Sequence, residues 1–179
     1  MISAAQSSMQ RAYCNGGPGV FVSGVVWLSA GAVLAAFGFI PGMTMFFFGG
    51  MAIHPLSVWI SNRVRQGAPQ VVPDPGLSRL AMATLPLLFG GLFLGWFLAL
   101  NAPLLFFPTV AVGVGLRYML FSRVYGRTLF IVLGGVLVSL SVADIVVGGT
   151  HVLFPVLVGL LEVGCGALLG VQPYSALSP

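Results

Sequence analysis

The stretch LAMATLPLLFGGLFLGWFLAL, from Leu80 to Leu100, has no charged side chain in 21 residues. A helix of roughly 20 apolar residues is long enough to cross the hydrocarbon core of a bilayer. Transmembrane strands instead alternate apolar and polar residues over about ten positions, and this stretch does not alternate. It therefore predicts a transmembrane helix.

Five further apolar runs of similar length accompany it. Two precede it and three follow it, at residues 20–39, 43–60, 104–121, 128–147 and 151–170. Short segments containing proline or glycine separate most successive runs, which is typical of turns between helices. The sequence predicts an all-α fold, a polytopic transmembrane helical bundle in one domain. Its six spans, including the one at residues 80–100, are expected to form three hairpins.

The composition excludes an ordinary water-soluble domain. Hydrophobic residues make up 58% of the 179 residues and charged residues only 6%, and the mean hydropathy is +1.07. A soluble domain carries about 25% charged residues, so this chain has too few to cover a water-exposed surface. The lipid bilayer is therefore the expected partner. The net charge of +4 is small and dispersed, so we expect no nucleic-acid partner.

The basic residues indicate which ends of the helices face the cytoplasm. All seven are arginine. If the amino terminus is inside, Arg117 lies near the cytoplasmic end of its span, and the other six fall in cytoplasmic segments: Arg11, Arg63, Arg65, Arg79, Arg123 and Arg127. The turns on the other side, at 40–42, 101–103 and 148–150, contain no arginine. Because basic residues accumulate on the cytoplasmic side, we expect both termini in the cytoplasm.

Two segments outside the spans carry local signals. Ser3 and Gln6 have the spacing of a capping box, so Ser3 to Tyr13 is predicted to be either a short surface helix or an unstructured tail. Ser61 to Ser78 is the longest polar stretch and contains several prolines and glycines. It is predicted to be the only substantial loop and the most mobile of the segments on the cytoplasmic side.

The hairpins also share short sequence patterns. Phe106-Phe107-Pro108 and Leu153-Phe154-Pro155 each lie one turn into an even-numbered span. These echoes indicate either a parallel repeat of three hairpins, a device known in transporters, or chance similarity between apolar segments.

Two segments of the first third of the chain resemble a known group of proteins. They are RAYCNGGPG from Arg11 to Gly19, followed by Ser23-Gly24 and Trp27, and FFGGM from Phe47 to Met51, followed by Pro55-Leu56. Both are similar to small bacterial integral membrane proteins of unknown function. The resemblance implies a multi-pass protein of the bacterial inner membrane, and it supplies no activity, substrate or site residue.

Glu162 is the most informative single residue. It lies eleven residues after His151, which places it ~16 Å from the outer face and near the middle of the bilayer. An unpaired charge there costs about 2.5–3.5 kcal/mol on insertion scales. His54 and Arg117 come at comparable depths, so we expect Glu162 to point into the bundle and to contact one of them. The contact is either a structural ion pair or a substrate or proton site.

Two of the candidate residues have plainer alternatives. Arg117 lies near the end of its span, where its long side chain can instead snorkel to the lipid headgroups. Asp144 should lie just below the outer interface, where His151 could reach it across the turn. There it either stabilises the turn or takes up protons from outside, so we include it among the candidate proton-site residues.

No cofactor or metal site is predicted. Cys14 and Cys165 do not make a disulfide framework, and we expect them as free thiols. No set of ligand-type side chains has a recognised metal-binding spacing. The sequence also lacks the phosphate-loop, nucleophile-elbow and zinc-protease signatures.

Three classes of function remain. The first is a small transporter or permease-like protein that binds a solute or proton near Glu162, His54 and Arg117. The second is a structural or accessory membrane protein whose polar residues only hold helices together. The third, a membrane-embedded enzyme, is disfavoured because no catalytic motif stands out. The substrate and the oligomeric state are not specified by the sequence.

Four prolines inside the predicted spans favour the first class. Interrupted helices are common around the binding sites of transporters, because a proline removes a backbone hydrogen bond. The prolines are Pro55, Pro86, Pro108 and Pro155.

The predicted topology can be tested with reporter fusions in a bacterial host. Fusions at residue 70 and at the carboxyl end should both report a cytoplasmic location, because all the arginines lie on that side. A periplasmic signal from either fusion would rule out the six-span arrangement.

Overall fold

A computed structural model describes residues 3–66, 71–147 and 152–174. All regular secondary structure in these ranges is helical, which confirms the predicted all-α fold. Six helical segments are long and apolar enough to cross a membrane, at Cys14–Phe37, Phe39–Val64, Pro75–Ala99, Pro103–Tyr125, Thr128–Val147 and Leu153–Val171. The chain is thus a multi-pass membrane protein by the length and composition of its helices.

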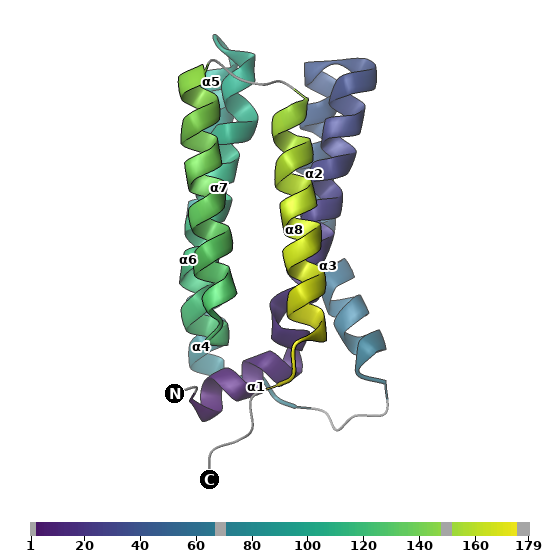
Figure 1. Ribbon diagram of the computed structural model, residues 1–179, viewed down its shortest axis with the longest axis vertical. Coiled ribbons are helices and arrows are strands. Elements are labelled where there is room, and N and C mark those ends of the chain that lie inside the picture. The colour runs from purple at the N-terminus through teal and green to yellow at the C-terminus, as the bar shows by residue number, and fades with distance from the viewer. Residues whose placement is uncertain (1–2, 67–70, 148–151, 175–179) are drawn as a thin grey trace.

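The spans correspond to seven α-helices in Figure 1. The third span is interrupted at Thr84 and is made of α4 (Pro75–Ala83) and α5 (Leu85–Ala99). The others are α2 (Gly17–Phe37), α3 (Phe39–Val64), α6 (Phe106–Tyr125), α7 (Thr128–Val147) and α8 (Leu153–Val171). Two short 3₁₀ turns, η1 (Cys14–Gly16) and η2 (Pro103–Leu105), precede α2 and α6.

The segment before the first span is the helix α1 (Ala4–Ala12). Ser3 caps it through the capping box with Gln6, which confirms the helical alternative for this segment. The helix lies across the end of the bundle at which α2 begins and α8 ends (Figure 1). One side of it is buried against the spans, including Ser7, Met9 and Gln10. We refer to this end as the terminal end and to the other as the far end.

The first far-end turn differs from the prediction. Gly38, with φ 90°, alone separates α2 from α3, and α3 begins at Phe39. Residues 40–42 are therefore helical and not a turn. Pro41 is compatible with this position, because the first turn of a helix has no hydrogen bond for a proline to remove.

The segment predicted as a long loop is also partly helical. α3 continues to Val64, and α4 begins at Pro75. Asp74 caps α4, because its Oδ1 accepts a hydrogen bond of 2.8 Å from the backbone N–H of Leu77. The prediction that this segment is the most mobile falls partly on residues 67–70, which lie outside the described residues.

The spans pack as two rows of three helices. α2 lies between α3 and α8, and α6 lies between α5 and α7, with extensive contacts inside each row (Figure 1). We call these the α2 row and the α6 row. α7 and α8 are consecutive in the chain but touch only slightly, because each belongs to a different row. The first two predicted hairpins, α2 with α3 and α5 with α6, pack as expected. The two helices of the third, α7 and α8, lie in different rows and do not form a packed hairpin.

Glycines allow the backbones to approach within the α2 row. A Cβ atom on Gly24 of α2 would lie 2.7 Å from the carbonyl oxygen of Gly159 on α8. A Cβ on Gly159 would lie 2.9 Å from the oxygen of Gly24. Small residues at such contacts replace the missing hydrophobic driving force with close packing.

Aromatic rings join the two rows toward the far end. The ring centroid of Trp27 on α2 lies 4.4 Å from that of Phe46 on α3 and 6.0 Å from that of Phe107 on α6. Phe39 also contacts Phe106, at 6.1 Å and in an edge-to-face arrangement. Aromatic pairs in this range stabilise by about 0.5–1.5 kcal/mol beyond their area burial.

Two glycines on α8 provide a matched test of this packing. A Cβ on Gly166 would clash with the backbone of Phe21, whereas a Cβ on Gly164 would meet nothing within 4 Å. Gly166→Leu should therefore destabilise the bundle by about 1–3 kcal/mol, while Gly164→Leu should leave stability nearly unchanged. Unfolding in detergent, followed by circular dichroism, measures both. Equal losses of stability would contradict the packing of α8 on α2.

Candidate functional site

Glu162 lies in the middle of α8, as the tenth of its 19 residues. Its side chain is fully buried, with a relative exposure of 0%. Neither carboxylate oxygen accepts a hydrogen bond from the residues that the structure describes. Glycines at 159 and 166 share this side of the helix and hold it against α2. The prediction that Glu162 points into the bundle is therefore confirmed.

Two hydroxyl groups lie beside the Glu162 carboxylate. Ser23 comes from α2 and Tyr118 from α6, and both are buried. Neither hydroxyl meets the geometry of a hydrogen bond to the carboxylate. We call Ser23, Tyr118 and Glu162 the carboxylate cluster. It draws on both rows, because α2 and α8 belong to one and α6 to the other.

A second buried polar atom without a hydrogen-bond partner among the described residues belongs to α2. The indole N–H of Trp27 is buried and finds no acceptor among the described residues. Trp27 follows Ser23 by one helical turn on α2, so both side chains lie on the same side of that helix. A buried N–H without an acceptor is uncommon in native structures.

Arg117 is not the partner of Glu162, contrary to the prediction. Its Nε donates a hydrogen bond of 3.1 Å to Oγ1 of Thr84, at the break between α4 and α5. Its guanidinium also lies 4.9 Å from the ring centroid of Phe121. The reason is angular: Arg117 and Tyr118 are adjacent on α6, so they point about 100° apart, and only Tyr118 turns toward α8.

His54 is not the partner either. It lies exposed on α3, so it does not line the buried space around Glu162. Asp144 is buried on α7, with a relative exposure of 6%. The contact predicted between Asp144 and His151 stays untested, because residue 151 lies outside the described residues. Of the four candidate residues, the structure places only Glu162 in the carboxylate cluster.

The prolines give less support to an interrupted-helix site than the sequence suggested. Pro55 is in the interior of α3. Pro86 lies directly after the break at Thr84 that divides the third span, whereas Pro108 and Pro155 lie in the first turns of α6 and α8. Backbone N–H groups in a first turn have no helical partner, so Pro108 and Pro155 remove no hydrogen bond.

Sequence reasoning missed a polar cluster at the terminal end. Nη2 of Arg127 donates to the carbonyl oxygen of Pro173 at 2.6 Å and to Oδ1 of Asn15 at 3.1 Å. Asn15 in turn donates to the carbonyl oxygens of Leu169 and Gln172 at the end of α8, at 3.1 and 2.9 Å. These bonds satisfy carbonyls that a helix end leaves without partners.

Gln10 completes this cluster from α1. Its Nε2 donates a hydrogen bond of 2.6 Å to the carbonyl oxygen of Tyr125, the last residue of α6. Its Oε1 also lies 3.5 Å from Nη2 of Arg127. We call Gln10, Asn15 and Arg127, with the carbonyl of Pro173, the terminal latch. It joins the α6 row, through Tyr125 and Arg127, to α1, to the turn that precedes α2 and to the residues at the end of α8.

The backbone between α1 and α2 explains how Asn15 reaches the latch. Cys14, Asn15 and Gly16 have φ values of 50°, 56° and 77°, so three successive residues adopt left-handed conformations. Asparagine and glycine tolerate this region best. Gly16 is also confined by the rings of Tyr125 and Phe130, each 3.0 Å from where its Cβ would lie. The sequence Asn-Gly before a membrane span was the available signal for this turn.

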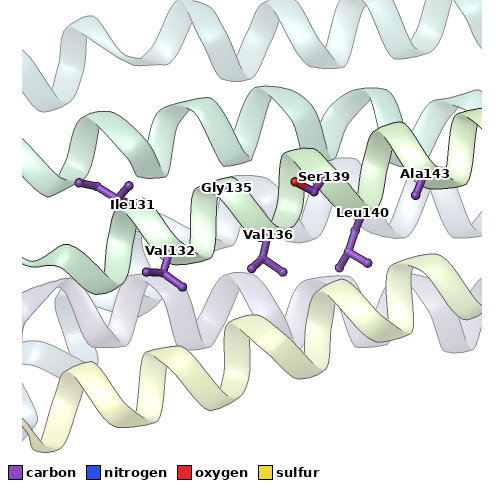
Figure 2. Close-up of a pocket in the computed structure, with 7 residues that line it drawn as sticks. All are labelled: Ile131, Val132, Gly135, Val136, Ser139, Leu140 and Ala143. Carbon is purple, nitrogen blue, oxygen red and sulfur yellow. The ribbon is translucent and has the colours of Figure 1, made fainter.

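No metal centre is formed by the part of the chain that the structure describes, where no group of three metal-ligand side chains occurs. An apolar groove runs along α7, and Figure 2 shows Val132, Val136 and Leu140 pointing from α7 toward α8. Its lining carries no charged side chain and is separate from the carboxylate cluster.

The chain belongs to a family of unknown function (DUF7010), whose model matches residues 2–172. This confirms that the chain is part of an uncharacterised family, and the match extends far beyond the first third of the chain. No curated protein matches the chain. No solved structure matches it either.

The separation of Glu162 from Arg117 leads to a double-mutant prediction. Glu162→Gln and Arg117→Gln should have additive effects on the free energy of unfolding, within about 0.5 kcal/mol, because the two side chains share no contact. Thr84→Val combined with Arg117→Gln should instead be non-additive, because Arg117 donates to Thr84. Unfolding in detergent measures both cycles. A clear coupling between positions 162 and 117 would show that they pair in the membrane.

Proposed function

We propose that this protein is a small proton-linked transporter or permease-like protein of the bacterial inner membrane, and that Glu162 binds the transported proton. Both termini would lie in the cytoplasm, and the lipid bilayer would surround the six spans. The observation that carries the proposal is a fully buried carboxylate that has neither a hydrogen-bond donor nor a cationic partner among the described residues.

The arginines support this orientation. α1, the end of α3, α4, the end of α6 and the turn after it all lie at the terminal end (Figure 1), and six of the seven arginines lie in or directly beside these segments. Basic side chains favour the cytoplasmic side of a membrane. The terminal end is therefore assigned to the cytoplasm.

The position of Glu162 supports a role in proton binding. An ionised carboxylate near the centre of a bilayer costs about 2.5–3.5 kcal/mol on insertion scales, unless it is paired or carries a proton. Neither Arg117 nor His54 pairs with it. A carboxyl group that gains and loses a proton satisfies this constraint without a cation, and ionisable residues in transmembrane segments commonly mark proton pathways.

Ser23 and Tyr118 are suited to pass a proton to Glu162. Each hydroxyl can donate one hydrogen bond and accept others, and both lie beside the carboxylate. Because Tyr118 belongs to the α6 row and Ser23 to the α2 row, the relay would run along the boundary between the rows. Tyr118→Phe would remove one hydroxyl and keep the ring.

The alternative is a structural or accessory membrane protein. The close glycine contacts in both rows would serve such a role equally well. The two functions make opposite predictions for Glu162→Gln. In an accessory protein this substitution leaves proton movement across the membrane unchanged, because the carboxyl group has no part in it.

Proton binding can be measured directly, because the chain has only three carboxylic side chains, at Asp74, Asp144 and Glu162. Infrared difference spectra of the protein in liposomes, recorded as pH is varied, should contain a carboxyl signal that Glu162→Gln removes. An imposed pH gradient, followed with an enclosed pH-sensitive dye, should collapse faster than in empty liposomes, and Glu162→Gln should abolish this difference.

Asp74→Asn is the matched control, because Asp74 caps the start of α4 and does not belong to the carboxylate cluster. It should remove a different carboxyl signal and leave the proton flux intact. If Glu162→Gln leaves both the infrared signals and the flux unchanged, Glu162 does not bind protons and the accessory role is favoured.

A further inference from the structure

The two rows have the same pattern of neighbours. We divide the chain into a first half, spans one to three, and a second half, spans four to six. In each row, the central helix is the first span of one half. Its two neighbours are the second span of the same half and the third span of the other half. α2 is flanked by α3 and α8, and α6 is flanked by α7 and α5. If spans one to three are matched with spans four to six, every extensive contact in one row has a counterpart in the other.

The closest backbone contacts also correspond. On the central helices, Gly24 is the eighth residue of α2 and Gly113 is the eighth residue of α6. Their partners Gly159 and Gly91 are each the seventh residue of α8 and α5. In both rows, a Cβ placed on the central glycine would lie within 3.3 Å of its partner glycine.

A second pair of contacts lies two residues further along each central helix. Val26 of α2 packs on Gly49 of α3, and Gly115 of α6 packs on Gly134 of α7. Gly49 and Gly134 each begin a Gly-Gly pair in their helices. Two independent contacts therefore share one register between α2 and α6.

The two halves run in opposite directions through the membrane. α2 begins at the terminal end, whereas α6 ends there (Figure 1). An odd number of spans in each half produces this inversion. Repeats of inverted topology are a known architecture of transporters, in which one group of helices rocks against the other around a site at their interface.

We infer that the six spans are two inverted three-helix repeats that exchange their third helices, and that the α2 row and the α6 row rock against each other to expose the carboxylate cluster alternately at the two ends. This rests on the function proposed above for Glu162. It replaces the parallel repeat of three hairpins, in which α7 and α8 would pack together.

A rocking motion requires contacts between the rows on both sides of the carboxylate cluster, and the structure has such contacts. At the terminal end, the hydrogen bonds of Arg127 to Asn15 and Pro173 tie the rows together. Toward the far end, Phe107 of the α6 row packs on Trp27 and Phe46 of the α2 row. Glu162 lies between these two sets of contacts. The rows therefore touch on both sides of Glu162, and the terminal end is joined in addition by the hydrogen bond of Gln10 to Tyr125.

The test uses a cysteine reporter beside Glu162. Ser23→Cys is introduced into the full chain with Cys14→Ser and Cys165→Ser, and labelling is followed with a membrane-impermeant maleimide added from one side at a time. Val72→Cys at the terminal end and Asn101→Cys at the far end are controls for sidedness, because both positions are exposed.

Two variants should open opposite ends. Arg127→Gln weakens the terminal latch, so the reporter should label about tenfold faster from the terminal end and not from the far end. Phe107→Ala removes an aromatic contact, so the increase should come from the far end only. Labelling of both variants from the same side, or of neither from any side, would overturn the inference.

A cross-link excludes loss of fold as the cause of labelling. Phe39→Cys and Phe106→Cys, whose native rings lie 6.1 Å apart, are joined by a short bifunctional maleimide before the reporter is labelled. The cross-link should suppress the far-end labelling of Phe107→Ala and leave the terminal-end labelling of Arg127→Gln unchanged. If it leaves the far-end labelling intact, Phe107 does not close that end and the inference fails.

Accessibility is independent of transport. If Glu162→Gln has no effect on proton flux but the reporter opens alternately, the repeats stand and the proton role is wrong. If proton flux depends on Glu162 but the reporter does not alternate, the proton role is supported and the rocking of the two rows is wrong.

Discussion

The architecture depends on backbone contact between helices at glycine positions. Within a bilayer, moving an apolar side chain from lipid to a helix contact gains little free energy, because both surroundings are apolar. Helices therefore associate where their backbones can approach closely. α2 meets α8 at Gly24 and Gly159, and α6 meets α5 at Gly113 and Gly91. These crossings fix which helices form each row, and the rows in turn decide which side chains face the boundary between them.

Glu162 owes its environment to these contacts. It lies one turn from Gly159 on the same side of α8, so the crossing that holds α8 on α2 also turns the carboxylate away from lipid. The corresponding position on α5, three residues after Gly91, is Leu94, which is exposed. Glu162 therefore has no carboxylate counterpart at the matching position of the α6 row.

The sequence predicted the features that depend on side-chain chemistry along a single helix. Apolar length identified the six spans, and the depth of Glu162 in the bilayer indicated that its side chain turns inward. Partner choice was not predictable, because a glycine on α8 has no feature that selects α2 over α7. Arg117 was assigned to Glu162 on depth alone, whereas its direction around α6 decides its contact with Thr84. The terminal latch was missed because most of its acceptors are backbone carbonyls, which every residue carries.

The pairing of α2 with α8 has a consequence for biosynthesis. A membrane protein is made from its amino end, and its spans enter the bilayer in that order. The glycine face of α2 then remains without its partner helix until the last span is inserted. Asn15 can donate its hydrogen bonds to the carbonyls at the end of α8 only after that step. Assembly of the α2 row is thus delayed to the end of synthesis, while α5, α6 and α7, consecutive in the chain, can associate as soon as they are inserted.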